Sequence, residues 1–406
     1  MEFCTQIANQ LMLKEIQNSF GKNIVSSPLS TNAVLNMVVA GSTGHTLKHM
    51  LGFLGSKNVD EINSKSRKMM AVAAGGGGRS SEIIGNGPIL TMVNGAWADR
   101  RFPLVSKYKE DVLKGIFKCE AYNVDCQTKA DQVVDEINAW ANTTSGGLIK
   151  EVLQHGSVDP KTVLILANGL YFKGLWDFDY EFDARRTEKR EFYLQDGSTV
   201  LVPFMTTISK DYYYRSSSKD YYYGSFDGFK VLKIPYQSCQ PNNFSMYFFL
   251  PEERDGLQNL IQKLNSNSRF LSQEYFELTE ETLEELWIPK FKFSFDFNVL
   301  EVMDDMGVSF SSIGNPRDLS EMVHNTDDVE PFLLKMFQKA YIEVDEKGTE
   351  AAAITHFRAV PDCSKLRPQN KRYNFVADHP FVFMIREERS GLIYFSGAVL
   401  NPIKQD

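Results

Sequence analysis

The chain is poor in cysteine and histidine, and both shortages narrow its chemistry. Its 406 residues include five cysteines, an odd number, and none lies in a Cys-x-x-Cys pair. This pattern predicts free thiols in a reducing compartment rather than a disulfide framework. We therefore expect a cytoplasmic protein, with a nuclear location or unconventional release to the outside as alternatives. The six histidines show neither His-Glu-x-x-His nor a Cys/His metal spacing, so no metal or other cofactor is expected.

Long apolar runs and a basic excess are also missing. No run of about 18 apolar residues could span a membrane, and the first residues lack the basic-then-apolar pattern of a secretory signal. The formal net charge is −8, which argues against nucleic acid or an anionic membrane as the main partner. We expect a monomer.

Signatures of catalysis are equally scarce. The sequence has no Gly-x-Ser-x-Gly elbow. Cys363 together with a distant histidine is a conceivable nucleophile, but no flanking signature supports it. We therefore expect a protein that is not an enzyme. The alternative is an enzyme that uses Cys363 as its nucleophile, and alkylation of Cys363 that leaves the protein's function intact would exclude it.

The apolar residues that are present form a mixture of helical and strand patterns. Hydrophobic residues make up 43% of the chain, enough for one large core, and we interpret residues 1–406 as a single domain. Ser27 and Pro28 suit the N-cap and first position of a helix. Spacings of three and four predict helices, and alternation or continuous apolar runs predict strands. The predicted helices are 2–20, 28–41 and 127–141, and the predicted strands are 23–26, 89–98, 162–172, 286–293, 333–344 and 375–377. The fold class is therefore α+β.

Residues 73–88 are rich in glycine and include four in succession. No Gly-Lys-Ser/Thr follows, so a phosphate-binding loop is not indicated. We interpret this stretch as a flexible surface insertion.

The stretch 346–374 links two predicted strands and is longer than most loops in compact domains. Every second residue from Thr349 to Ala359 is small or apolar and none is charged, whereas the alternate set carries both charges and a histidine. This pattern is typical of a strand that is buried on one side. We interpret it as a stored strand that is exposed at first and inserted later. The alternative is a mobile loop whose alternation is accidental.

Several motifs resemble those of one family, the serpins, and in detail the plant serpins. The run 346–353, Glu-Lys-Gly-Thr-Glu-Ala-Ala-Ala, is similar to the hinge of an inhibitory serpin, and the stretches 375–381 and 395–402 are similar to the serpin signature and closing strands. The resemblance implies the serpin fold, with three β-sheets, about nine helices and an exposed reactive-centre loop at about 346–374. The hinge residues it implies are Glu346, Gly348, Thr349, Glu350, Ala351, Ala352 and Ala353.

The resemblance also assigns residues that hold the main sheet closed. At its centre, the implied shutter residues are Ser27, Ser30, Asn168 and Gln338. A buried Asn168 needs hydrogen-bond partners, and by resemblance these are the two serines and the residue on the strand before the loop. That last residue is usually His but here is Gln338, which puts the strength of the shutter in doubt. At the end of the sheet, the breach, the implied residues are Trp176 and Lys290, and Lys290 would pair with Glu346.

The mechanism that the resemblance implies is single-use inhibition of a serine or cysteine endopeptidase. The protease cleaves the loop as a substrate and forms an acyl-enzyme. The freed loop then inserts between the strands that contain Asn168 and Gln338, and the protease is dragged along and distorted. Counting fourteen residues from Gly348 places the scissile bond at Asp362–Cys363, with Val360 and Pro361 as further specificity residues. Counting back from Phe375 shifts the bond toward Ser364.

An acidic residue before the scissile bond requires a protease pocket that neutralises or hydrogen-bonds a carboxylate. We expect an aspartate-directed target, caspase-like or, as a second choice, legumain-like. The alternative within the same fold is a non-inhibitory serpin that acts as a substrate-like, binding or chaperone module. Bulky Ile354 and Phe357 in the loop, together with Gln338, favour that alternative, and the Gly-Thr-Glu-Ala-Ala-Ala hinge argues against it.

Overall fold

The computed structural model describes residues 2–18, 21–75, 88–147, 149–208, 220–238, 243–266, 278–308, 316–325, 333–349 and 373–405. Most of the glycine-rich insertion predicted at 73–88 lies outside these ranges. The helices are α1 (Glu2–Asn18), α2 (Pro28–Ala40), α3 (Gly44–Phe53), α4 (Val59–Gly75), a π-helix (Tyr108–Lys114), α5 (Cys126–Thr144), α6 (Leu257–Ser266) and α7 (Val299–Asp305). Short 3-10 turns cover Ala184–Arg186 and Pro316–Leu319.

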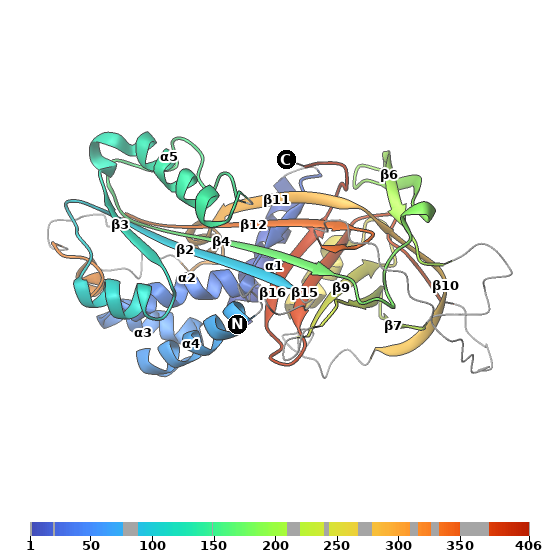
Figure 1. The fold of residues 1–406 in the computed structure, drawn as a ribbon, viewed down its shortest axis with the longest axis horizontal. Helices are drawn as coiled ribbons and strands as arrows, with labels where there is room; N and C mark the ends of the chain where they lie inside the picture. The colour runs from blue at the N-terminus through green and yellow to red at the C-terminus, as the bar shows by residue number, and fades with distance from the viewer. Residues whose placement is uncertain are drawn as a thin grey trace.

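A six-stranded sheet runs through the middle of the molecule, and we call it the main sheet. Its order is β11-β12-β13-β4-β2-β3. Helices α2, α3 and α4 lie on one side of it and α5 crosses the other (Figure 1). The bounds are β2 (Ile89–Asp99), β3 (Glu120–Val124), β4 (Thr162–Leu175), β11 (Phe291–Asn298), β12 (Leu333–Asp345) and β13 (Gly348–Thr349).

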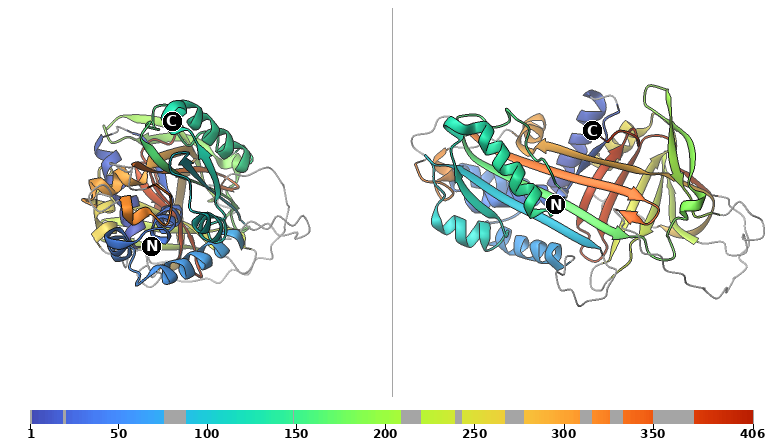
Figure 2. Two further views of the ribbon diagram at one scale, coloured as in Figure 1. Left: turned by 90° about the vertical axis from the view of Figure 1, so that its left-hand side faces the viewer. Right: turned by 45° about the horizontal axis from the view of Figure 1, so that its top comes forward.

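The remaining strands form a second, curved sheet at the other end of the elongated molecule (Figure 2). Its order is β1-β16-β15-β9-β8-β7-β10-β6-β5, with β14 also paired to β10. The bounds are β1 (Ile24–Ser26), β5 (Glu188–Tyr193), β6 (Thr199–Met205), β7 (Asp220–Phe226), β8 (Phe229–Pro235), β9 (Phe244–Pro251), β10 (Thr279–Pro289), β14 (Tyr373–Val376), β15 (Phe381–Glu387) and β16 (Ile393–Val399).

The long strand β10 explains why two sheets appear where three were expected. Its first half pairs with β7, and its second half pairs with β6 and β14. Two of the expected sheets therefore share one strand and join into one hydrogen-bonded network. The predicted α+β class is confirmed.

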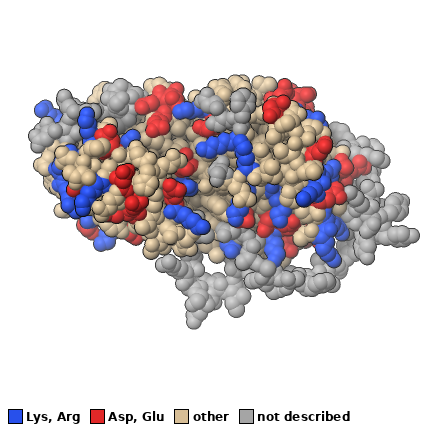
Figure 3. Space-filling view, turned by 90° about the horizontal axis from the view of Figure 1, so that it is seen from above, with Lys and Arg blue, Asp and Glu red and all other residues tan. Residues whose placement is uncertain are grey.

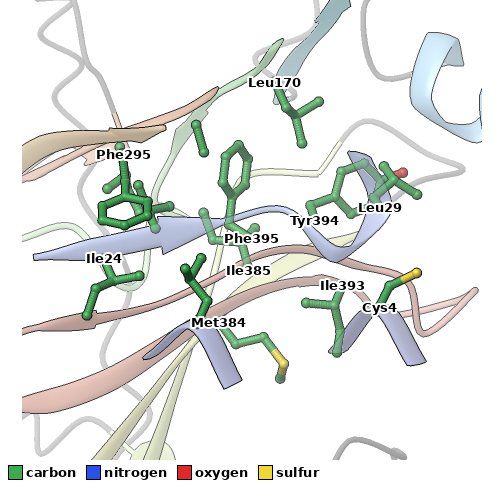
Figure 4. Close-up of a cluster of buried hydrophobic side chains, with 14 of the residues drawn as sticks. Cys4, Ile24, Leu29, Leu170, Phe295, Met384, Ile385, Ile393, Tyr394 and Phe395 are labelled. Atoms are coloured by element: carbon green, nitrogen blue, oxygen red, sulfur yellow. The ribbon is translucent and has the colours of Figure 1, made fainter. Parts of the chain in front are cut away.

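A large hydrophobic core joins the two sheets and the helices beneath the main sheet. Figure 4 shows Leu170 and Phe295, from the main sheet, close to Ile385 and Phe395 of the second sheet, with Leu29 of α2 nearby. All five side chains are buried. Burying apolar surface contributes about 25 cal/mol of folding free energy per Å², so this core is the main stabilising contribution to the fold. It also means that the backbone of the main sheet rests on a closely packed layer.

The start of α2 and the end of β10 show how local sequence determines where helices and strands begin and end. Ser27 accepts a hydrogen bond from the backbone N–H of Ser30, and Pro28 takes the first helical position, so the predicted N-cap is confirmed. The predicted single strand at 286–293 is wrong, because β10 ends at Pro289 and β11 begins at Phe291 in the other sheet. Lys290 stands at this crossing, which carries it to the end of the main sheet. Among the described helices, none is long and apolar enough to cross a membrane.

Candidate functional site at the hinge and seam of the main sheet

The start of the predicted loop enters the main sheet as a two-residue strand. β13 pairs antiparallel with the end of β4 on one side and with the end of β12 on the other. Beyond it, β4 and β12 pair directly in parallel register from Leu333 to Tyr341. We call this direct contact between β4 and β12 the seam. The first hinge residues therefore already occupy the position that a further inserted strand would take.

Gly348 is the point where the chain turns into the sheet, and only glycine fits there. Its φ is +155°, a value that other residues rarely adopt. A Cβ atom at this position would lie 2.0 Å from the carbonyl oxygen of Gly174. Both the backbone conformation and the close approach to β4 thus require the absence of a side chain.

Thr349 anchors the inserted end through aromatic residues of the breach. Its hydroxyl lies 2.6 Å from the hydroxyl of Tyr236, and burial raises the pKa of that tyrosine far above its usual value. Tyr236 stacks on Trp176, with ring centroids 4.6 Å apart. Trp176 donates from its backbone N–H to the carbonyl of Lys347 and from Nε1 to the carbonyl of Asp345. The breach tryptophan predicted from the sequence therefore touches the hinge directly.

Glu346 is held at the base of the hinge by Lys290 and Thr187. Lys290 Nζ lies 2.7 Å from Oε2, and the Thr187 hydroxyl donates to Oε1 at 2.6 Å. Burial alone would raise the pKa of Glu346, but these two hydrogen bonds outweigh it and leave that pKa below its usual value. The Lys290 side chain is 36% exposed and that of Glu346 only 11%. The structure thus forms the pair that the resemblance implied, with one partner well sheltered from water.

Gln338, at the centre of the seam, fastens β12 to α2. Its amide donates to the carbonyl of Ser27 at 2.7 Å and accepts from the hydroxyl of Thr31 at 3.3 Å, and all three residues are buried. Gln338 lies opposite Asn168 in the β4–β12 register. The side chain therefore connects β12 to the start of the helix beneath it.

Asn168 does not make the expected hydrogen bonds to the two serines. Its Nδ2 donates to Oδ1 of Asn94 at 2.7 Å, and Asn94 in turn donates to the carbonyl of Phe117. Asn94 and Asn168 are cross-strand partners on β2 and β4. Their side chains therefore lie next to each other on one face of the sheet and can form a hydrogen bond. Asn168 is thus tied to its own side of the seam, away from Ser27, Ser30 and Gln338.

Two buried oxygens at this centre are left without a partner among the described residues. They are Oδ1 of Asn168 and Oγ of Ser30. An unsatisfied buried polar atom costs about 1–3 kcal/mol. The closed seam is therefore stabilised on the Gln338 side and destabilised at Asn168 and Ser30.

A separate small cluster under α5 covers the seam from the outside. Val133 and Ile137 of α5 pack with Ile165 and Ala167 of β4 and with Phe337 of β12. Because these residues come from both edges of the seam, α5 must shift if a strand enters there.

Beyond the part of the seam that α5 covers, aromatic and charged side chains lie along β4, β12 and β11. Tyr171 and Tyr341 stack across it, with ring centroids 6.3 Å apart. Tyr341 donates to Glu343, which pairs with Lys292 at 3.0 Å. On the side that is uppermost in Figure 1, basic and acidic side chains are intermixed (Figure 3). An entering strand would separate the two tyrosines.

Part of the predicted site falls outside the described residues. These are the hinge residues Glu350, Ala351, Ala352 and Ala353, the specificity residues Val360 and Pro361, and the predicted bond Asp362–Cys363. Within the described residues, no group of three or more His, Cys, Asp or Glu side chains is arranged to hold a metal ion.

Four residues of the site were missed by sequence reasoning. Asn94 carried a usable signal, since it is a polar residue near the middle of a mostly apolar strand, as Asn168 is. Thr31, Thr187 and Tyr236 carried none, because they approach the hinge or seam only through contacts between elements distant in sequence.

Comparisons with known proteins agree with this geometry. The family model described as "Serpin (serine protease inhibitor)" matches residues 1–402. The chain is 40% identical to Serpin-Z10 of Arabidopsis thaliana over 389 residues, covering 95% of this chain and 93% of the relative. It is 37% identical to Serpin-Z3 of the same plant, covering 98% and 96%. A solved structure of an Arabidopsis serpin, AtSerpin1 in its "native stressed conformation", superposes with a TM-score of 0.84 at 36% identity, covering 100% of this chain and 98% of the other.

Proposed function

Because this chain belongs to the serpin family of serine protease inhibitors, we propose that it traps a target endopeptidase by inserting its cleaved loop into the seam. The observation that carries the proposal is β13, which already lies between β12 and β4. A loop continuing from Thr349 is thereby aimed at the only direct β4–β12 contact found in the described part of the main sheet. The hinge is a strand that has begun to insert.

The chemistry begins as ordinary proteolysis. The nucleophile of the protease attacks the carbonyl carbon of the residue before the scissile bond and forms an acyl-enzyme, and the amine of the next residue leaves with a proton. The acyl end of the loop stays attached to the hinge but is no longer joined to β14, so this part of the loop is free to extend along the seam, while the new amine end remains on the β14 side. This chain provides the substrate and the trap, and the protease provides the catalysis.

Insertion is favoured by new strand pairing and by the unsatisfied polar groups at the centre of the seam. A new antiparallel strand would pair with both β4 and β12, and the alternating small residues from Thr349 onward would face the core. Asn168 and Ser30 hold unsatisfied oxygens at the centre of the path. Opposing this, Gln338 must exchange its contacts with Ser27 and Thr31, and α5 must move. The balance of these contributions sets the rate of trapping.

We further propose Asp362–Cys363 as the scissile bond and an aspartate-directed protease as the target. The support is the count from Gly348 and the acidic side chain of Asp362, which calls for a basic or hydrogen-bonding pocket. A caspase-like enzyme fits first and a legumain-like enzyme second.

The test combines gel electrophoresis with mass spectrometry. The protein is incubated with a caspase-like, a legumain-like and an arginine-directed protease, and the products are separated under denaturing conditions. We expect a covalent complex with an aspartate-directed enzyme and release of a peptide beginning at Cys363. The variant Asp362→Ala should lose the complex, whereas Asp60→Ala, which changes an exposed acidic residue of α4, serves as the control. Cleavage only after Arg358 or Arg367 would contradict the assignment. Cleavage by every enzyme without a complex would support the non-inhibitory alternative.

A further inference from the structure

Two histidines lie side by side on the exposed face of α3, far from the hinge in the fold. His45 and His49 are four residues apart on this helix, and both are exposed. Their ring centroids are 4.1 Å apart, with the rings tilted by 39°. Within the described part of the chain, neither ring has a hydrogen bond or an ion pair that would occupy its nitrogens. α3 lies on the outer side of the helical layer (Figure 1).

From this geometry we propose that His45 and His49 form a surface chelate for a divalent transition-metal ion. Side chains at i and i+4 share one face of a helix, and the same spacing supplies two zinc ligands in the His-Glu-x-x-His motif. Imidazole nitrogens bind zinc at about 2.0–2.1 Å, which requires the ring centroids to separate to roughly 4.5–5 Å. Ordinary side-chain rotation in two exposed residues supplies that change.

The surroundings orient one ring and leave the ion accessible. His49 packs edge-on against Phe53, with centroids 6.5 Å apart, and Phe53 stacks on Phe3 of α1. This aromatic contact limits the rotation of His49 toward the end of the helix. Exposed Lys48, between the two histidines in sequence, is the nearest charge along the helix and weakens the attraction for a cation. The ion would keep water in its remaining positions.

Imidazole ligands select the class of ion. They suit copper, zinc and nickel, whereas magnesium and calcium prefer oxygen ligands. The expected order of affinity is Cu²⁺ above Ni²⁺ and Zn²⁺. With two protein ligands, the site binds more weakly than a structural zinc site with four.

His155 offers a matched comparison on the same molecule. It is also exposed, but its two ring nitrogens face different carboxylates, Nδ1 toward Asp131 at 3.7 Å and Nε2 toward Asp135 at 3.3 Å. This arrangement links a ring to two acids and does not converge on one ion. A variant at His155 therefore removes a surface histidine without removing the proposed chelate.

The test is calorimetric titration of the full chain with CuCl₂ and ZnCl₂ at neutral pH, after alkylation of Cys239 and Cys363. We expect one ion per chain, tighter binding of Cu²⁺ than of Zn²⁺, and a rise in unfolding temperature with either ion. His45→Ala and His49→Ala should each weaken binding at least tenfold, and His155→Ala should leave it unchanged. Circular dichroism of each variant confirms that it is folded. Equal binding by His45→Ala, one ion shared by two chains, or no binding at millimolar ion would overturn the proposal.

Discussion

The hydroxyl oxygens of Thr349 and Tyr236 lie 2.6 Å apart at the point where the described hinge ends. Tyr236 also stacks on Trp176, and Trp176 donates hydrogen bonds to the backbone carbonyls of Asp345, at the end of β12, and Lys347, in the hinge. The buried side chain of Trp176 is therefore in direct contact with the hinge, and its fluorescence reports on the position of the hinge. Any change that withdraws β13 from the sheet should alter the environment of Trp176 and its fluorescence.

Replacing Gly348 with alanine should expel β13 from the sheet. The added Cβ would lie 2.0 Å from the carbonyl oxygen of Gly174 at a φ that alanine rarely adopts. We expect a red shift of Trp176 emission and a loss of trapping activity of tenfold or more. The control is Gly52→Ala in α3, where a Cβ meets nothing within 4 Å, and it should change neither property. An unchanged Gly348→Ala protein would show that hinge insertion is not required.

Replacing Lys290 with methionine should loosen the base of the hinge. Glu346 would keep Thr187 but lose its cation, at an expected cost of about 1 kcal/mol, because the lysine is partly exposed. We expect the unfolding temperature to fall by about 1 °C in a chain of this length and spontaneous inactivation to become faster. Lys292→Met is the matched control, because it removes an exposed pair with Glu343 on the same sheet. Equal effects from the two variants would argue against a special role for Lys290.

The same pair predicts a pH dependence. The folded-state pKa of Glu346 lies below the usual value of 4.5, although burial opposes this. Its stabilising contribution is therefore complete above about pH 5 and is lost as the pH falls through the folded-state pKa. We expect Trp176 emission to change below about pH 4 while the far-ultraviolet spectrum is retained. Glu346→Gln should lack this step, whereas a step of equal size in that variant would assign it to another group.

Replacing Gln338 with alanine should open the centre of the seam. It would remove two buried hydrogen bonds, to Ser27 and Thr31; the Ser27 carbonyl keeps the backbone N–H of Thr31, but the Thr31 hydroxyl is left unpaired at a cost of about 1–3 kcal/mol. We expect a lower unfolding temperature and faster conversion to an inactive, loop-inserted form. Asn94→Ala should also lower the unfolding temperature, since it leaves the Asn168 amide without its acceptor, but it keeps the contacts of Gln338 to α2 in place. Slower conversion of Gln338→Ala would contradict the role given to this residue.

The regular elements and the hinge could be predicted because their signals are local. The apolar stripe of α5 and the N-cap of α2 lie within one stretch of sequence, and the structure agrees with both. The crossing at Lys290 was missed because an alternating pattern does not record which sheet each half joins.

The sequence pointed to Asn168 and Gln338 as residues at the centre of the seam, but not to the hydrogen bonds that they form. Asn168 and Gln338 do face each other in the register, yet each is bonded away from the other, to Asn94 and to α2. Which neighbour a buried amide reaches depends on the packing of three elements, and that information is not carried by any one of them.

The most direct test of the account is thermal unfolding of the intact protein and of protein nicked once between residues 350 and 365. If the loop beyond Thr349 inserts into the seam after cleavage, nicking should raise the unfolding temperature far above that of the intact chain. The emission of Trp176 should change in the same sample. An unchanged or lower unfolding temperature would mean that the loop does not insert, and the trapping mechanism would be wrong.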